Sequence, residues 1–144
     1  MSFAVVVPMA NEAPDFHPFV DELTNVMDSL NAGTVYFVVD RVSKDETLAL
    51  CNGVSDKDPR FVTLWSPENR NVVDAYMKGY RTAFRNGHRQ ILEMDAGLSH
   101  EPKAIPMFLK ALNEGYECAF GSRFISGGSM NHSNYARVFL SKYG

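Results

Sequence analysis

The sequence has little cysteine, no strong excess of either charge and no long apolar run. Its two cysteines, Cys51 and Cys118, lack CxxC or metal-ligand spacing, so we interpret them as ordinary thiols in a reducing cytoplasm. No apolar run approaches the roughly 20 residues that span a bilayer, and the amino terminus lacks the basic region of a signal peptide. The formal net charge of −3 gives no general attraction to nucleic acid. We therefore expect a cytoplasmic protein with no nucleic-acid partner.

Several familiar nucleotide-binding and catalytic motifs are also absent. No G-x-G-x-x-G follows the first apolar segment and no G-x-x-x-x-G-K-[ST] occurs, which excludes the dinucleotide fingerprint and the P-loop. Neither G-x-S-x-G nor HExxH is present, and the four histidines are scattered. The chain has 144 residues, 45% hydrophobic and 22% charged, with no internal repeat or linker. This composition predicts one globular domain over residues 1–144.

What the sequence does contain is a regular alternation of apolar segments with amphipathic ones. The expected strands are residues 3–8, 35–39, 61–65, 91–94 and 116–120, and the expected helices lie near 18–30, 47–50, 72–84 and 105–112. Residues 4–7 are continuously apolar, which is typical of a strand that is covered on both faces. Strands alternating with helices predict an α/β fold, with a mostly parallel sheet and helices on both of its faces.

Local signals predict where several of these helices begin and end. Pro18 suits the first turn of the first helix, and Gly33 can end it. Ser43 and Glu46 have the spacing of a capping box before the second helix, and Asn71 can cap the third. The third helix is expected to present an apolar face made of Val72, Val73, Tyr76, Met77, Tyr80 and Phe84.

Polar residues lie directly after four of the expected strands. Glu12 follows the first, Asp40 the second, Asp95 the fourth and Arg123 the fifth. The carboxyl ends of parallel strands share one edge, which is where ligands bind in open α/β sheets. Carboxylates there can hold a ribose, a base edge or a divalent cation, and an arginine can hold a phosphate. For any one of these positions a solvated loop residue, or for Asp95 a turn former, is usually the safer interpretation, but four together favour a site.

Beyond these general features, the chain resembles a known family. Its motifs resemble those of the GT-A glycosyltransferases of family 2, and most closely the polyprenyl-phosphate sugar transferases of the dolichol-phosphate mannosyltransferase type. The resemblance covers nearly the whole chain, in the order and spacing that the family shows. The segments that carry it are Pro8-x-x-Asn11-Glu12, Asp40-x-x-Ser43-x-Asp45-x-Thr47, Met94-Asp95-Ala96-x-Leu98-Ser99-His100-x-Pro102, Gly121-Ser122-Arg123-Phe124 and Arg137-x-x-x-Ser141.

The resemblance implies a Rossmann-like GT-A fold and transfer of a sugar from a nucleotide donor, typically GDP-mannose, to a polyprenyl or dolichyl phosphate with inversion. It implies that Asp95 is the catalytic centre, beside Mg²⁺ or Mn²⁺ and the donor phosphates, with Ser99 as a further metal ligand. Glu12 and Asp40 would line the nucleoside. The remaining residues of the implied nucleotide-sugar site are Pro8, Ala96, Arg123 and Arg137, of which the arginines would face phosphate groups.

Three departures from the family pattern affect this expectation. The family's D-x-D metal motif reads Asp95-Ala96-Gly97 here, so the second carboxylate is missing and cation binding should be weak. The second of the paired aspartates after the second strand is replaced by Arg41. The aromatic residue that usually follows Pro8 by two positions is replaced by Ala10, and the usual glycines near 72–74 are replaced by Val72, Val73 and Asp74.

The family also sets an expectation about length, because its catalytic domain normally continues well beyond the Arg137-x-x-x-Ser141 element. We expect this chain to be the amino-terminal, donor-binding portion of a GT-A fold. The longer protein would associate peripherally with a membrane, and the shortened sheet would expose apolar surface that favours homo-oligomers. Two functions remain open at this stage, a glycosyltransferase or its donor half, and a nucleotide-sugar-binding module that has lost turnover.

Overall fold

The computed structural model describes residues 2–97 and 100–122. Its strands are β1 (Phe3–Met9), β2 (Thr34–Val39), β3 (Phe61–Trp65) and β4 (Gln90–Glu93). Its α-helices are α1 (Phe16–Leu30), α2 (Thr47–Ser55), α3 (Val72–Arg85) and α4 (Ile105–Asn113), and two short 3₁₀ helices are η1 (Ala13–Asp15) and η2 (Pro102–Ala104). Among these described residues, no helix is both long and apolar enough to cross a membrane.

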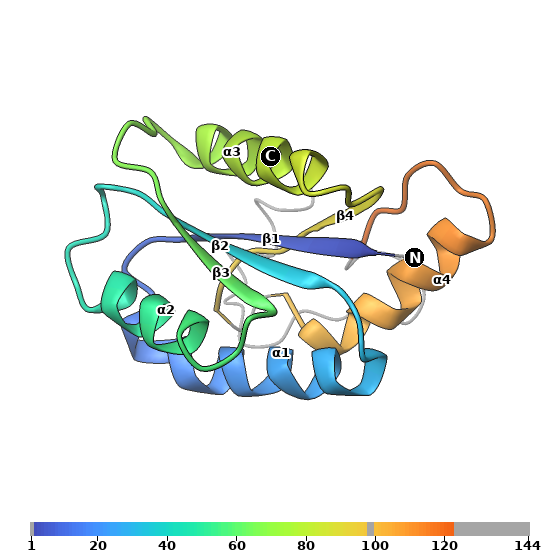
Figure 1. Ribbon diagram of the computed structural model, residues 1–144, viewed down its shortest axis with the longest axis horizontal. Helices are drawn as coiled ribbons and strands as arrows, with labels where there is room; N and C mark the ends of the chain where they lie inside the picture. The colour runs from blue at the N-terminus through green and yellow to red at the C-terminus, as the bar shows by residue number, and fades with distance from the viewer. Residues whose placement is uncertain (1, 98–99, 123–144) are drawn as a thin grey trace, which may run out of the picture.

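The four strands form one parallel sheet in the order β3-β2-β1-β4. β1 is central, with Val6 opposite Tyr36 on β2 and opposite Glu93 on β4. Figure 1 shows α3 on one face of the sheet and α1 and α2 on the other. The predicted α/β architecture, with a parallel sheet and helices on both faces, is confirmed.

The continuous apolar run of β1 is explained by its two covered faces. Val5 and Val7 belong to the large core, together with Phe16 and Phe19 of α1. The alternate residues of the strand, which include Val6, face the smaller cores beneath α3. Successive strand side chains point to opposite faces, so every residue of this strand needs an apolar neighbour.

Helix α3 packs on the sheet through small residues rather than large ones. Its buried positions are Ala75, Gly79 and Ala83, which recur every four residues. A Cβ atom at position 79 would overlap the Cγ1 methyl group of Val6, so only glycine allows this close approach. The predicted apolar face of this helix is confirmed only in part. Tyr76 and Tyr80 are partly buried against the core beneath the helix, but the other four residues are exposed: Val72, Val73, Met77 and Phe84.

The predicted helix caps have different outcomes. The Oδ1 atom of Asn71 accepts a 3.0 Å hydrogen bond from the backbone N–H of Asp74, which confirms this cap. α1 ends at Asn31, which already has a left-handed φ of 47°, rather than at Gly33. The capping box of Ser43 does not form, because α2 begins at Thr47 and Glu46 takes the cap position without a side-chain hydrogen bond.

The predicted fifth strand is also wrong. Residues 116–120 pair with no strand in the described part of the chain, and the backbone bends at Glu117. Tyr116 is 64% exposed and Phe120 is 89% exposed, so the face that would carry both residues in a strand is not packed. Burial of one face is what normally fixes the register of a strand, and here that burial is missing.

Candidate functional site

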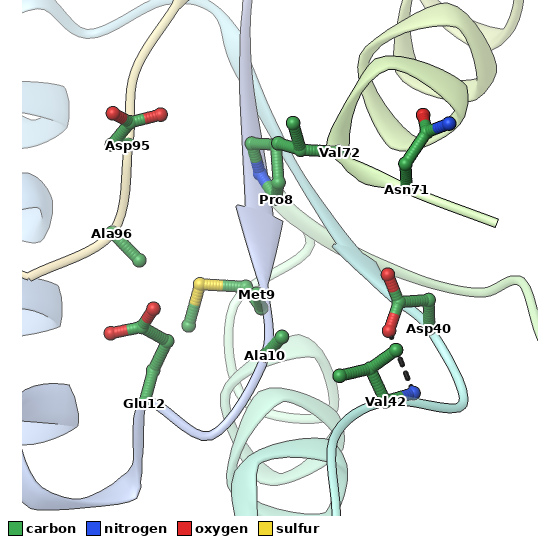
Figure 2. Close-up of a pocket in the computed structure, with 10 residues that line it drawn as sticks. All are labelled: Pro8, Met9, Ala10, Glu12, Asp40, Val42, Asn71, Val72, Asp95 and Ala96. Atoms are coloured by element: carbon green, nitrogen blue, oxygen red, sulfur yellow. Dashed lines mark hydrogen bonds between the residues drawn. The ribbon is translucent and has the colours of Figure 1, made fainter. Parts of the chain in front are cut away.

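A cavity of about 470 Å³ lies at the carboxyl edge of the sheet, where β1, β2 and β4 end and α3 begins. Five of the residues expected in the nucleotide-sugar site line it: Pro8, Glu12, Asp40, Asp95 and Ala96. The other lining residues are Met9, Ala10, Val42, Asn71 and Val72. Figure 2 shows Asp95, Ala96 and Glu12 on one side of the end of β1, and Asp40 and Asn71 on the other.

Glu12 reaches the cavity from the loop between β1 and η1. The loop turns at Asn11, whose φ of 57° is left-handed, a conformation that asparagine adopts more readily than most residues. Burial is the main cause that raises the pKa of the Glu12 carboxyl, and the nearby carboxylates of Asp15, Asp45 and Asp95 raise it further. The charge of this carboxylate is therefore disfavoured unless a hydrogen-bond donor or a cation binds to it.

Asp40 forms the most deeply buried polar part of the cavity wall, with 8% of its surface exposed. Its Oδ1 atom accepts a 2.9 Å hydrogen bond from the backbone N–H of Val42, which folds the chain back after β2 (Figure 2). A carboxylate fixed in this way offers its remaining acceptor positions to the cavity. Such a group suits the N–H groups of a base or the hydroxyl groups of a ribose.

Asp95 is positioned by α3 as well as by its own strand. The Met94 N–H donates to the Val6 carbonyl, so the hydrogen bonding between β1 and β4 continues to the residue before Asp95. The Tyr76 hydroxyl donates a 2.6 Å hydrogen bond to Asp95 Oδ1, and the pKa of Tyr76 is raised, first by burial and then by this carboxylate. Sequence reasoning missed Tyr76 because it treated the residue as part of an apolar helix face.

His100 adds a second contact to the Asp95 turn. Its Nδ1 atom accepts a 3.0 Å hydrogen bond from the Asp95 backbone N–H, and its Nε2 atom lies 3.8 Å from Asp95 Oδ2. In a neutral ring this arrangement places the proton on Nε2, facing the carboxylate. The histidine thus closes the turn, while the Asp95 side chain stays 55% exposed to the cavity.

Gly97 leaves open space where the family's second metal carboxylate would stand. Its φ is 81°, and among the described residues the one atom within 4 Å of a Cβ built there is Glu12 Oε2, at 3.8 Å. Within residues 2–97 and 100–122, no three histidine, cysteine or acidic side chains come together to hold a metal ion. Mg²⁺ commonly binds through one or two carboxylates plus substrate phosphates. The oxygen donors of Asp95 and Glu12 fit a cation that the phosphates of a ligand help to hold.

Three residues expected in the site lie outside the described residues. These are Ser99, Arg123 and Arg137. Conversely, the cavity includes Asn71 and Val72, which sequence reasoning assigned only to the start of a helix. The predicted helix follows the carboxyl end of a strand in a parallel sheet, and this position could have indicated that its first residues line the site.

Comparison with known proteins identifies the family of this chain. The glycosyl transferase family 2 model matches residues 4–143. The chain is 30% identical over 142 residues to a dolichol-phosphate mannosyltransferase of Pyrococcus furiosus, covering 99% of the chain and 39% of that protein. It is 30% identical to a polyprenol monophosphomannose synthase of Mycolicibacterium smegmatis, covering 96% and 51%, and 26% identical to an undecaprenyl-phosphate mannosyltransferase of Micrococcus luteus, covering 98% and 56%. The chain thus spans about half the length of these curated relatives, and it belongs to glycosyl transferase family 2.

Proposed function

We propose that this chain forms the donor site of a glycosyltransferase that moves mannose from GDP-mannose to a polyprenyl or dolichyl phosphate with inversion. One observation carries the proposal, the convergence of Glu12, Asp40 and Asp95 on one cavity at the carboxyl edge of a parallel sheet. The names of similar proteins support the choice of mannose and of a lipid phosphate acceptor.

Each lining residue has a chemical role in this proposal. Asp40 and Glu12 accept hydrogen bonds from the nucleoside, with Pro8 and Ala96 as neighbouring wall. The first turn of α3, which begins beside Asn71, presents backbone N–H groups and a partial positive charge that suit the donor phosphates. The proposal also assigns Arg123 and Arg137 to phosphate groups and Ser99 to the cation.

The reaction asks little of a general base, because the acceptor phosphate is already ionised at neutral pH. Its main demands are holding the donor in line and stabilising the leaving diphosphate. Asp95, fixed by Tyr76, lies where a donor phosphate or its cation would be held. Mg²⁺ or Mn²⁺, held by Asp95 and the donor phosphates, would neutralise charge on the leaving group. The acceptor is a membrane lipid, so the proposal includes peripheral association with the cytoplasmic face of a membrane.

A binding experiment tests the donor site directly. Thermal unfolding of the purified chain is measured with GDP, GDP-mannose, UDP and UDP-glucose, each with and without Mn²⁺. A nucleotide present at 100 times its dissociation constant should stabilise the fold by about 2.7 kcal/mol. We expect stabilisation by the guanine nucleotides and its loss in Asp95→Asn. No stabilisation by any of the four would contradict the proposal.

Gly97 favours a second candidate function, a nucleotide-sugar-binding module without turnover. The position that carries the family's second metal carboxylate has no side chain here. Donor hydrolysis, measured with and without Mn²⁺, separates the two functions. Hydrolysis that Mn²⁺ accelerates supports the enzyme, whereas tight binding without any hydrolysis supports the module.

A further inference from the structure

We propose that Asp45 is a positioning residue for Glu12, and that it acts through Thr47 to hold the Glu12 loop against the loop that follows β2. The inference rests on the proposed function, since it assigns Glu12 to the donor site. It concerns two residues that lie beside the cavity and do not line it.

Thr47 and Asp45 accept hydrogen bonds from the backbone of Glu12 and of the residue after it. The Glu12 backbone N–H donates a 2.8 Å hydrogen bond to Thr47 Oγ1, and the Thr47 hydroxyl donates a 2.6 Å hydrogen bond to Asp45 Oδ1. The next backbone N–H, that of Ala13, donates a 3.0 Å hydrogen bond to Asp45 Oδ2. One carboxylate therefore fixes two consecutive peptide groups, the first through a hydroxyl and the second directly.

Asn11 and Ser43 complete the link between the two loops. The Asn11 N–H donates to Ser43 Oγ at 3.1 Å, and Ser43 Oγ donates to Asp45 Oδ1 at 3.2 Å. The Asn11 Nδ2 atom also donates to the Val42 carbonyl at 3.3 Å, and in the opposite direction Asn11 Oδ1 accepts from the Lys44 N–H at 2.8 Å. Because Val42 and Glu12 line opposite parts of the cavity, this link also sets the distance between them.

The Glu12 side chain depends on this backbone link for its position. Among residues 2–97 and 100–122, no hydrogen-bond donor reaches its carboxylate, so within this part of the chain the carboxylate is located by its main chain and by partial burial. Partial burial and three nearby aspartates oppose its charge, and a loosened loop would let it move into solvent. Thr47 is fully buried whereas Asp45 is exposed, so the charge of Asp45 is available to the loop at little desolvation cost.

The test uses GDP as the probe and calorimetric titration as the measurement. Asp45→Asn keeps the shape of the side chain and removes the charge that four donors share, namely the Ala13 and Thr47 N–H groups and the Ser43 and Thr47 hydroxyls. We expect GDP binding to weaken about tenfold. Thr47→Val should have a similar effect because it removes the hydroxyl between Asp45 and Glu12. Thr47→Ser, which keeps that hydroxyl, should retain most of the wild-type affinity.

A double-mutant cycle distinguishes positioning from a general loss of stability. If Asp45 acts through Glu12, Asp45→Asn should change GDP affinity less than twofold in a Glu12→Ala background. Asp58→Asn is the matched control, because Asp58 also accepts a backbone N–H and a side-chain donor in a local turn, both from Arg60. It lies before β3, at the far edge of the sheet, and should lower the melting temperature without weakening GDP binding.

The possible outcomes separate the two proposals. A wild-type chain that binds no nucleotide overturns the proposed function and this inference with it. A wild-type chain that binds GDP, with Asp45→Asn binding equally well, overturns only the positioning role. An equal loss of affinity for Asp45→Asn with and without the Glu12 side chain also overturns it, since Asp45 would then act by another route.

Discussion

Polar groups at the amino edge of the sheet bond to one another, whereas those at the carboxyl edge face a cavity. At the amino edge, the Tyr36 hydroxyl accepts from Asn86 Nδ2 at 2.8 Å and lies 3.1 Å from His88 Nε2, while His88 Nδ1 lies 2.7 Å from Ser2 Oγ. At the carboxyl edge, the carboxylates of Asp40 and other residues open onto a cavity. Polar groups that bond one another stabilise the fold, and polar groups that face a cavity are available to a ligand.

The same contrast appears in the charged residues. Near the amino edge, Arg60 bonds Asp58 at 2.6 Å and Asp28 at 2.7 Å, so each of these carboxylates has a cationic partner. At the carboxyl edge, burial raises the pKa of Glu12, and the like charges of nearby carboxylates, including that of Asp95, raise it further. Such uncompensated charge is typical of functional sites. A bound cation, or a hydrogen-bond donor on a ligand, would reduce this repulsion.

The largest expected effect comes from the deepest carboxylate of the carboxyl edge. Asp40→Asn keeps an oxygen that can accept from the Val42 N–H, so the fold should be little changed. It removes a charged acceptor from the cavity, and such hydrogen bonds contribute about 1.5–3 kcal/mol. GDP affinity, measured by calorimetry, should therefore fall about 10- to 150-fold. Unchanged affinity would show that the nucleoside lies elsewhere.

The matched change at the amino edge is Tyr36→Phe. It leaves His88 and Asn86 without the hydroxyl that they share in the buried network. We expect a loss of about 1–3 kcal/mol in the free energy of unfolding, measured by urea denaturation, with GDP affinity unchanged below the unfolding transition. If this variant weakened GDP binding as much as Asp40→Asn, the two edges would not be functionally distinct.

The sequence predicts the strands and their order better than it predicts individual side-chain contacts. The four observed strands were predictable within one or two residues, because each is a short apolar run with a turn signal after it. The meeting of Glu12, Asp40 and Asp95 followed from the parallel order alone. Individual side-chain hydrogen bonds between elements did not follow. The bond from Tyr76 on α3 to Asp95 after β4 is an example, because it depends on how the helix packs on the sheet.

Two further errors have a common physical cause. The pattern of large apolar residues on α3 suggested a buried face, but the close approach of this helix to β1 selects Gly79 and small neighbours instead. The alternating residues 116–120 suggested a strand, but a strand also needs a partner and a packed face. In both cases the sequence shows which residues could pack, and only the tertiary structure decides what they meet. The expected roles of Ser99, Arg123 and Arg137 stay predictions.

A smaller effect is expected from restoring a carboxylate at the carboxyl edge. Gly97→Asp should strengthen the dependence of GDP binding on Mn²⁺ by about fivefold, equivalent to about 1 kcal/mol. Because position 97 has a left-handed φ of 81°, adding a side chain there should also lower the free energy of unfolding by roughly 1 kcal/mol. Gly87→Asp, at another positive φ outside the cavity, is the control for that strain. Equal Mn²⁺ dependence in all three proteins would place the cation elsewhere.

The smallest effect concerns pH at the amino edge. Burial lowers the pKa of His88 below its usual value of 6.5, so the unfolded chain binds its proton more readily than the folded chain. The stability from the neutral histidine is therefore fully present above pH 6.5 and declines as pH falls from there through the folded pKa. His88→Asn should flatten this part of a stability curve measured by urea denaturation. A wild-type curve that rises toward lower pH in this window would contradict the assignment.

The difference between the two edges can be tested most directly by nuclear magnetic resonance. Backbone amide signals of the ¹⁵N-labelled chain are followed while GDP-mannose is added. The donor-site account predicts shifts at the amides of Glu12, Val42, Asn71 and Asp95, with those of Asn86, His88 and Asp58 unmoved. Shifts confined to the amino edge, or no shifts at saturating nucleotide, would contradict it.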